Sequence, residues 1–379
     1  MQLNNIQDTA YFYLTPEGKS LAEKLAASHP GDIYGKENFK ENLRNAFSRY
    51  DYLVCIMATG IVVRILAPLI VHKTSDPGVV VLDQKGRHAI SLLSGHLGGA
   101  NDLAREMAFL SGGEAVITTA TDVAGEISFD SFAKKYDLAI ENIGQLKHIS
   151  GALLEGRQIC VISDFDDFQE KWPELYQGEK EGKLLIYRKE EFIKKKEGLL
   201  GHTDHRKTEV SANCEEEREA SVPATMLMSM PTVVIDEGLV IDWAQPVLYL
   251  RPRTICAGIG CKRNMEAEPI EAALLETLKK EGLSPLSLKY ISTIPLKADE
   301  PGILTTCQHL HVPLKVIPTE EIESLDIHDL GIATSDFVEK QTGVLSVSTA
   351  SSYLASGKGR ILVDKAKFKG ITVALSKMR

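Results

Sequence analysis

Residues Ser91 to Asp102 read Ser-Leu-Leu-Ser-Gly-His-Leu-Gly-Gly-Ala-Asn-Asp. This stretch joins an apolar run, Ala89 to Leu93, to an amphipathic run, Leu103 to Leu110. This order predicts a strand, a glycine-rich corner that carries His96, and the start of a helix. Glycine adopts backbone angles that side chains forbid, and the free N–H groups of a helix start favour negative charge. The corner is therefore a candidate anion-binding site. The simpler interpretation is a tight turn in which His96 only bonds the backbone.

The composition is that of a multidomain globular protein. At 379 residues the chain is too long for one average core, and its 44% hydrophobic and 25% charged residues are ordinary values. The net charge of −9 argues against a general affinity for nucleic acid or anionic lipid. No apolar run is long enough to span a membrane, no signal peptide is apparent, and the cysteines are scattered rather than set at metal-binding spacing. We therefore expect a cytoplasmic protein without a structural metal.

The predicted fold class is α/β, with several domains. Strand-like and helix-like segments alternate over residues 1–138, which indicates a largely parallel sheet flanked by helices. Residues 252–379 repeat this pattern and end in a strongly basic segment, which we expect to form a hairpin. Residues 139–251 are predicted to form a smaller middle α/β region, in which the densely charged stretch 189–221 is expected to be a mobile loop.

Two further corners are similar to the one at His96. The turn Thr59-Gly60 follows a buried strand, and Gly258-Ile-Gly260-Cys261-Lys262-Arg263 joins a strand to a strong helix. Ligands of α/β sheets usually bind outside the carboxyl ends of the strands, so both corners are candidate binding positions. The Gly-x-Gly pattern lacks the third glycine of a dinucleotide fingerprint, which argues against NAD.

Two sets of motifs are specific enough to suggest a family. The N-terminal set is Met57-Ala-Thr59-Gly60-Ile-Val-Val-Arg64, Lys73-Thr-Ser-Asp76-Pro77, Val80-Val-Leu-Asp83 and Ser94-Gly95-His96-Leu-Gly98-Gly99-Ala-Asn101. The C-terminal set is Gly258-Ile-Gly260-Cys261-Lys262, Leu296-Lys297-Ala-Asp299-Glu300-Pro-Gly302 and Lys365 to Gly370. Together they resemble the cobalt-precorrin-5A hydrolase family (CbiG) of anaerobic cobalamin biosynthesis. One position departs from the family: Ser348-Thr349 stands where Ala-Glu is expected, so no role is carried over for that carboxylate.

The resemblance implies a reaction. The substrate is a cobalt-bound, ring-contracted tetrapyrrole whose ring A acetate is closed as a δ-lactone onto the extruded bridge carbon. Water opens the lactone, and the extruded carbon leaves with its methyl group as acetaldehyde, which gives cobalt-precorrin-5B. The cobalt belongs to the substrate, so no cofactor and no protein metal are implied. The implied partners are this small molecule and, transiently, neighbouring enzymes of the cobalamin pathway, with neither nucleic acid nor membrane.

Opening a lactone requires an activated water and a stabilised oxyanion. We predict that His96 is the general base, because an imidazole titrates near neutral pH. A carboxylate would orient the imidazole or replace it as the base, and the candidates are Asp76, Asp83 and Asp102. The backbone amides around Gly98, Gly99 and Ala100 are predicted to bind the oxyanion.

A covalent route is the alternative to direct attack by water. The chain lacks a Gly-x-Ser-x-Gly nucleophile elbow, which weakens a serine-type mechanism and a generic esterase function. The nucleophiles that would remain are Thr59, Ser94, Thr118 and Cys261. Of these, Thr59 is retained beside His96, Asp76 and Asp102 as a predicted catalytic residue.

The many carboxylates of such a substrate need cations and backbone amides, because an unpaired carboxylate is costly to bury. We expect the corners of both terminal regions to supply them to one macrocycle. The predicted substrate-binding residues are Gly60, Arg64, Lys73, Ser94, Gly95, Gly98, Gly99, Asn101, Gly260, Cys261, Lys262, Lys297, Asp299, Glu300, Lys365 and Lys367, with Arg263 as a further candidate. For each cation alone, a solvated surface position is the simpler explanation.

A second function is also compatible with these motifs. The C-terminal region alone resembles a small, separately encoded protein of the aerobic cobalamin pathway. The chain could therefore be a non-catalytic carrier of a labile cobalt-corrinoid intermediate that fragments by itself.

Overall fold

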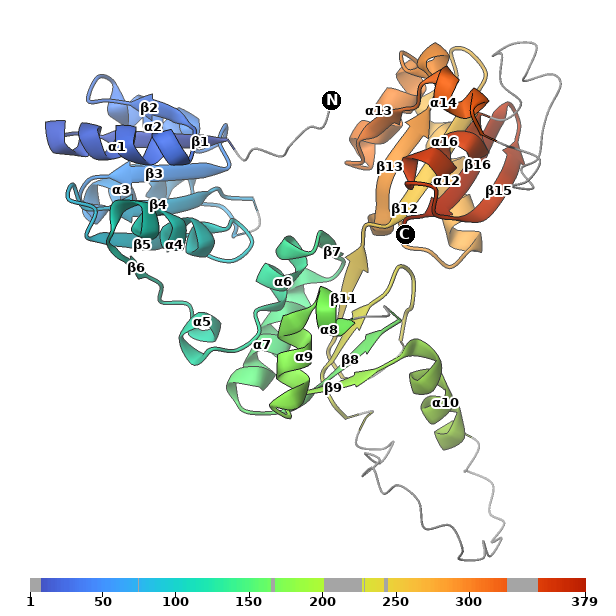
Figure 1. The fold of residues 1–379 in the computed structure, drawn as a ribbon, viewed down its shortest axis with the longest axis horizontal. Coiled ribbons are helices and arrows are strands. Elements are labelled where there is room, and N and C mark those ends of the chain that lie inside the picture. The colour runs from blue at the N-terminus through green and yellow to red at the C-terminus, as the bar shows by residue number, and fades with distance from the viewer. Residues whose placement is uncertain are drawn as a thin grey trace, which may run out of the picture. The chain divides into compact units, whose positions relative to one another are not determined.

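The computed structural model describes residues 8–73, 75–164, 168–200, 227, 229–241, 245–325 and 347–379. The chain divides into two compact units, residues 1–135 with 150–157 and residues 136–149 with 158–379, and each is considered by itself. Within the described residues, the first unit contains one six-stranded sheet and the second contains two five-stranded sheets (Figure 1). No helix among the described residues is both long enough and apolar enough to cross a membrane.

The N-terminal sheet has the strand order β2-β1-β3-β4-β5-β6. Its strands are β1 (Thr9–Tyr13), β2 (Asp32–Tyr34), β3 (Tyr52–Ile56), β4 (Gly78–Leu82), β5 (His88–Leu93) and β6 (Glu114–Val116). The first four strands pair in parallel, as expected for alternating strands and helices. The helices of this unit are α1 (Pro16–Ser28), α2 (Phe39–Ala46), α3 (Thr59–Leu66), α4 (Ala100–Ser111), α5 (Ala120–Ala124) and α6 (Phe129–Lys135).

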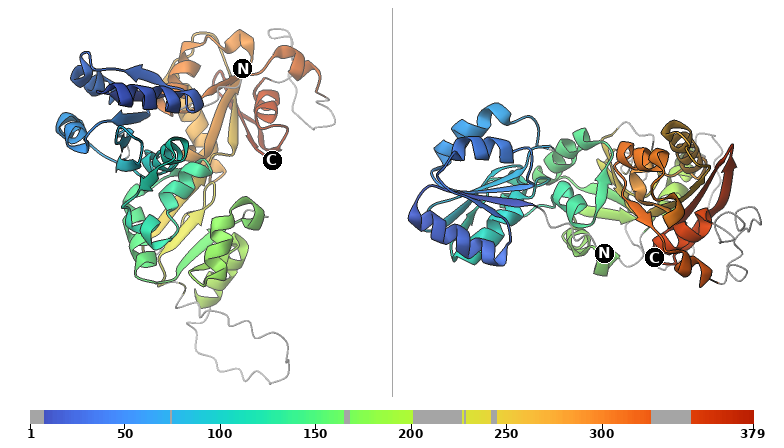
Figure 2. Two further views of the ribbon diagram at one scale, coloured as in Figure 1. Left: turned by 60° about the vertical axis from the view of Figure 1, so that its left-hand side comes forward. Right: turned by 90° about the horizontal axis from the view of Figure 1, so that it is seen from above.

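Helices cover both faces of this sheet (Figure 2, right). Successive strand residues point to opposite faces, so Tyr11 of β1 packs with α1 and α4 while its neighbour Phe12 packs with α2 and α3. Both cores are apolar and closed: Leu25 of α1 and Leu43 of α2 have no exposed surface. The sheet is thus rigidly held, and its two edges are left to carry polar residues.

Strand β5 reverses the direction of the sheet. Only five residues separate β4 from β5, and Asp83 closes this turn by accepting hydrogen bonds from the N–H groups of Lys85 and His88, both at 2.9 Å. Such a short connection allows only an antiparallel pair, since a parallel crossover needs a dozen or more residues. Accordingly, Val79 pairs with Leu93 at one end and Leu82 pairs with Ala89 at the other.

This reversal corrects the expectation that the two N-terminal corners contact the same macrocycle. The Thr59-Gly60 corner follows the carboxyl end of β3, whereas the His96 corner lies at the amino ends of β3 and β4. A Cβ on Gly78, the first residue of β4, would lie 2.7 Å from the Gly98 carbonyl oxygen. The two corners are therefore about 16 Å apart, the length of a five-residue strand.

The middle sheet has the strand order β7-β11-β10-β8-β9, and only β7 pairs in the antiparallel sense. Its strands are β7 (Leu138–Ile140), β8 (Ile159–Ser163), β9 (Leu184–Tyr187), β10 (Thr232–Ile235) and β11 (Val247–Pro252). The neighbouring helices are α7 (Leu146–Leu154), α8 (Phe168–Lys171), α9 (Pro173–Lys180) and α10 (Lys189–Leu200).

Helix α10 corrects the prediction of a loop over residues 189–221. The twelve residues of α10 are helical, and Phe192 is only 1% exposed because it joins the core of the middle sheet. Dense charge is also typical of the solvated faces of an amphipathic helix, so it does not distinguish a helix from a loop. Residues 201–221 lie outside the described part of the chain.

The C-terminal sheet has the strand order β14-β13-β12-β16-β15. Its strands are β12 (Ile255–Cys261), β13 (Leu288–Thr293), β14 (Leu314–Val316), β15 (Arg360–Phe368) and β16 (Ile371–Lys377), and its helices are α12 (Ala267–Lys280), α13 (Pro301–His309), α14 (Thr319–Glu323) and α16 (Ser348–Ala355). Strands β12 to β14 are parallel, and β15 and β16 form the predicted basic hairpin. The expectation of largely parallel sheets flanked by helices is confirmed.

A close approach of α16 to β12 explains one glycine of the C-terminal motif. A Cβ on Gly258 would overlap the carbonyl oxygen of Ser348 and would lie 2.8 Å from the Ser351 hydroxyl. Gly258 therefore lets the helix backbone pack directly on the strand. Its role is to allow this packing, and it does not form part of a dinucleotide fingerprint.

We expect Gly258→Ala to destabilise the protein by about 1–3 kcal/mol, the usual range for overpacking a close-packed site. Gly151→Ala is the matched control, because a Cβ there meets nothing within 4 Å and alanine is favoured inside a helix. Thermal unfolding of the two variants measures the effect. An unchanged midpoint for Gly258→Ala would contradict the packing argument.

Candidate functional site

The corner after β5 is built as a turn of four residues. The Gly99 N–H donates to the His96 carbonyl oxygen at 2.9 Å, and Gly99 has a φ of 81°, which favours glycine. Helix α4 starts at the next residue, and the N–H of Asn101 returns to the Gly95 carbonyl oxygen at 2.9 Å. The predicted order of strand, glycine-rich corner and helix is confirmed, and His96 lies at the tip of the corner.

The imidazole of His96 lies between two carboxylates. Its Nε2 is 2.6 Å from Oδ2 of Asp122 in α5, and its Nδ1 is 3.2 Å from Asp130 in α6. The three side chains are only 12–16% exposed. The interpretation in which His96 merely bonds the backbone is therefore wrong, because both ring nitrogens face charged side chains.

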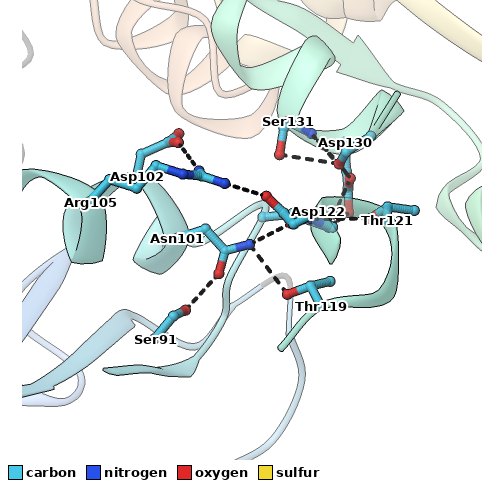
Figure 3. A network of polar contacts seen from close by, with 11 residues as sticks. Ser91, Asn101, Asp102, Arg105, Thr119, Thr121, Asp122, Asp130 and Ser131 are labelled. Atoms are coloured by element: carbon cyan, nitrogen blue, oxygen red, sulfur yellow. Dashed lines mark hydrogen bonds and ion pairs between the residues drawn. The ribbon is translucent and has the colours of Figure 1, made fainter. Parts of the chain in front are cut away.

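Asp122 is the centre of a wider network (Figure 3). Besides His96, its carboxylate accepts from Arg105 Nη2 at 2.6 Å and from Asn101 Nδ2 at 2.9 Å. The Asn101 side chain in turn accepts from the Ser91 hydroxyl at 2.7 Å, which ties β5 to α4 and α5. The amide of Asn101, predicted to bind substrate, is thus occupied within the protein.

These contacts shift the pKa values of all three groups in the direction of an ion pair. Burial by itself lowers the pKa of His96, but hydrogen bonds and charge from Asp130, and then from Asp122, outweigh it and raise that pKa above 6.5. Burial by itself raises the pKa of Asp122, but hydrogen bonds from Arg105 and His96 bring it below 3.8. The pKa of Asp130 is lowered against burial in the same way, by His96 and Ser128. The contacts therefore favour the imidazolium, and the neutral ring that a general base requires forms as pH rises through the raised pKa of His96.

The orienting carboxylates are not the ones predicted. Asp76 lies in the loop before β4, where it accepts from the N–H of Val71 at 3.0 Å, and Asp83 closes the β4–β5 turn. Asp102 is 76% exposed and pairs with Arg105 at 3.0 Å, so it reaches the cluster only through that guanidinium. Each of these acids satisfies local backbone or surface groups, as is usual for aspartates in turns.

The amides available for an oxyanion also differ from the prediction. The N–H groups of Gly99 and Ala100 donate to the carbonyl oxygens of His96 and Ser94, so neither is free. Among the described residues, none accepts a hydrogen bond from the N–H groups of Leu97 and Gly98, the two central residues of the turn. The turn therefore leaves two adjacent donors open beside the imidazole.

The opposite edge of the N-terminal sheet carries a separate pocket of about 560 Å³. Apolar side chains form most of its wall, and the polar lining residues are Thr15, Thr59, Asp83, Gln84 and His88. Gly60 is the second residue of α3, after the pocket residue Thr59, and the exposed Arg64 donates to the Gly60 carbonyl oxygen at 3.0 Å. Thr59 is thus brought together with Asp83 but not with His96.

The C-terminal motif residues gather at the carboxyl ends of β12 and β13 and in the loop after β13. Glu300 is 1% exposed and lies 3.1 Å from Lys297 Nζ, 3.5 Å from Arg263 Nη1 and 2.9 Å from the N–H of Asn264. Lys297 is itself buried, so its charge is balanced within the protein. The ion pair of Lys297 and Glu300 holds the loop after β13 in place. Asp299, in the same loop, is 76% exposed.

The remaining C-terminal candidates have different surroundings. Burial raises the pKa of the Cys261 thiol above 9.0, with a smaller opposing effect of Lys297, so this cysteine is a poor nucleophile. In the register of the sheet, Gly260 of β12 lies opposite Thr372 of β16, and Thr372 lies opposite Lys367 of β15. Lys367 therefore lies at the same end of the strands as Gly260. Lys365 is half-buried, and burial followed by the nearby charge of Lys367 lowers its pKa. Lys262 and Lys73 are exposed.

Sequence reasoning missed Asp122 and Asp130, which complete the His96 cluster. Both follow β6, in the short helices α5 and α6. Pairing β5 with β6 in parallel would have placed the chain after β6 near the end of β5, and therefore near His96. The signal was the run Thr118-Thr-Ala-Thr-Asp122, whose polar side chains follow an apolar strand.

The His96 cluster should make stability depend on pH in a defined direction. Because the folded pKa of His96 lies above 6.5, its contribution is complete below that pH and is lost as pH rises through the folded pKa. The contributions of Asp122 and Asp130 are present above 3.8 and are lost only as pH falls below that value.

We therefore expect the thermal midpoint of wild type to fall between pH 6 and pH 9 and His96→Gln to flatten this slope. His148→Gln, at an exposed histidine of α7, is the control and should keep the wild-type slope. Identical slopes for wild type and His96→Gln would contradict the imidazolium assignment.

Comparison with known proteins places the whole chain in one family. Three family descriptions match consecutive segments: Cobalamin synthesis G N-terminal over residues 41–122, Cobalamin biosynthesis central region over 127–252, and Cobalamin synthesis G C-terminus over 255–376. The cobalt-precorrin-5A hydrolase of Salmonella typhimurium is 31% identical over 97% of both chains. That of Priestia megaterium is 30% identical over 97% of this chain and 94% of its own. Protein CobE of a Sinorhizobium species is 27% identical over 28% of this chain and 68% of its own. The chain therefore belongs to the cobalt-precorrin-5A hydrolase family.

Proposed function

We propose that this protein is a cobalt-precorrin-5A hydrolase, which opens the ring A acetate δ-lactone and releases the extruded carbon with its methyl group as acetaldehyde, leaving cobalt-precorrin-5B. Relatives with this name match nearly the whole chain, which supports the reaction. The observation that carries the catalytic assignment is the largely buried His96 imidazole between Asp122 and Asp130, in a turn with two N–H groups that no described residue accepts from.

The proposed hydrolysis moves one proton through His96. Asp130 holds Nδ1 of the His96 imidazole, and Asp122 contacts Nε2. In the proposed step, the imidazole rotates about its contact with Asp130, so that Nε2 leaves Asp122 and faces the water. The neutral imidazole takes a proton from water, and the water oxygen adds to the lactone carbonyl carbon. The C–O bond of the lactone ring then breaks. The imidazolium then returns its proton to the alkoxide on the extruded carbon.

Release of acetaldehyde follows from the alcohol formed in this step. Loss of the hydroxyl proton lets the bond between the extruded carbon and the macrocycle break, and the electron pair of that bond stays on the macrocycle. Arg105 and Asn101 hold the Asp122 carboxylate in place, so the His96 imidazole can return to this carboxylate after each proton transfer. The same base can therefore serve both steps.

The turn residues supply the electrostatic part of the proposal. Water addition places negative charge on the lactone carbonyl oxygen, and the open N–H groups of Leu97 and Gly98 are donors for it. One such donor is worth about 3–4 kcal/mol in comparable sites. The substrate brings its own cobalt, so the proposal requires no bound metal or cofactor, and we propose that the reaction takes place in the cytoplasm.

Acetaldehyde release from cobalt-precorrin-5A separates catalysis from mere binding. We expect wild type to accelerate the release over the protein-free reaction and His96→Ala to lose about 10²- to 10⁴-fold of that rate, the range for a general base. His88→Ala, at the opposite sheet edge, is the control and should retain the wild-type rate.

Two outcomes would contradict this account. Equal release with and without wild type would leave only the carrier function. A His96→Ala rate within about tenfold of wild type would remove the assignment of His96 as the base.

A further inference from the structure

Lys134 is a half-buried lysine beside the His96 corner that the proposed mechanism leaves unused. It lies one helical turn after Asp130 on α6, so both side chains project from the same face of that helix. Its Nζ is 3.2 Å from the Tyr52 hydroxyl oxygen and 5.4 Å from the centre of the Tyr52 ring. Tyr52 is the first residue of β3 and therefore belongs to the amino edge of the sheet.

The charge of Lys134 has no carboxylate in contact with it. Among the described residues, no Asp or Glu oxygen lies within 4.0 Å of Nζ, and Asp102 and Asp51 act on it only through space. Lys297 in the C-terminal sheet shows the usual alternative, because its buried ammonium is 3.1 Å from Glu300. A half-buried cation without an ion pair is costly unless a ligand supplies the negative charge.

The position of the ammonium is set by Gly99. A Cβ on Gly99 would overlap Nζ of Lys134 and would lie 2.6 Å from the Tyr52 hydroxyl, so only glycine lets the ammonium lie against the turn. Gly98, the preceding residue, has one of the two N–H groups that no described residue accepts from. The ammonium thus lies against the same turn that carries His96 and the two backbone donors.

We propose that Lys134, with the N–H groups of Leu97 and Gly98, binds the carbonyl oxygen of the ring A acetate as it becomes negative. This inference rests on the proposed hydrolase function and adds an anion-binding residue to it. The ammonium carries a full positive charge, whereas the amides are neutral. Charge-assisted hydrogen bonds are about twice as strong as neutral ones. Tyr52 holds the lysine stem in place through its ring and hydroxyl.

Lys134→Met tests the inference because it keeps the length and apolar character of the stem and removes the charge. We expect kcat for acetaldehyde release to fall about 10²-fold or more, with KM changed less than about threefold, because the interaction is made in the transition state. Lys134→Arg should restore part of the loss. Lys40→Met, at an exposed lysine of α2, is the control and should match wild type.

The outcomes separate the two proposals. Wild-type kcat in Lys134→Met, with or without a lower thermal midpoint, would show that the lysine only packs on Tyr52 and would overturn this inference while leaving the hydrolase function standing. A loss in Lys134→Met that Lys134→Arg does not reduce, together with a lowered midpoint, would also overturn it. If wild type does not accelerate acetaldehyde release, the proposed function and this inference fail together.

Discussion

The direction of β5 decides where the chemistry of the N-terminal sheet lies. Five residues join it to β4, so the two strands must form a hairpin and β5 must run against the four parallel strands. Its carboxyl end, with the His96 corner, therefore lies at the amino edge of the sheet. Ligands of parallel sheets usually bind at the other edge, where this protein has an apolar pocket. The reversal thus places a second candidate site, built from polar side chains, at the opposite edge of the same sheet.

The cluster at that edge holds three separate elements together through one carboxylate. Asp122 contacts His96 from the corner and Asn101 and Arg105 from α4, so α5 is bound to both. Such buried ion pairs contribute little net stability, because desolvation offsets their attraction, but removing one partner is costly. We interpret the cluster as a device that fixes the position of His96 and raises its pKa, and that adds little to the stability of the fold. In the described part of the chain, no residue accepts from the Leu97 and Gly98 amides of the turn and no carboxylate contacts Lys134, which agrees with that interpretation.

The sequence predicted local structure well and the arrangement in space only in part. Alternating apolar segments identified most strands of the N-terminal sheet, but only β12, α12 and the β15–β16 hairpin of the C-terminal sheet, because periodicity reports which residues are buried. It could not report that β5 turns back, although the short Asp83 to Arg87 connection carried that information. For the same reason Asp122 and Asp130 were missed, since they approach His96 only through the pairing of β5 with β6. Asp76, Asp83 and Asp102 were predicted to orient His96 as acidic residues in or next to the N-terminal motifs, and a place in a motif does not establish contact.

The central claim is that substrate binds at the amino edge, against the His96 turn, and not in the pocket at the carboxyl edge. Amide hydrogen exchange of a His96→Gln variant, measured with and without cobalt-precorrin-5A, tests this directly because the variant is expected to bind without turnover. The account predicts slower exchange at Leu97 and Gly98 and no change at Thr59 and Gly60. Slower exchange at Thr59 and Gly60 with none at the turn would contradict it and would move the active site to the pocket.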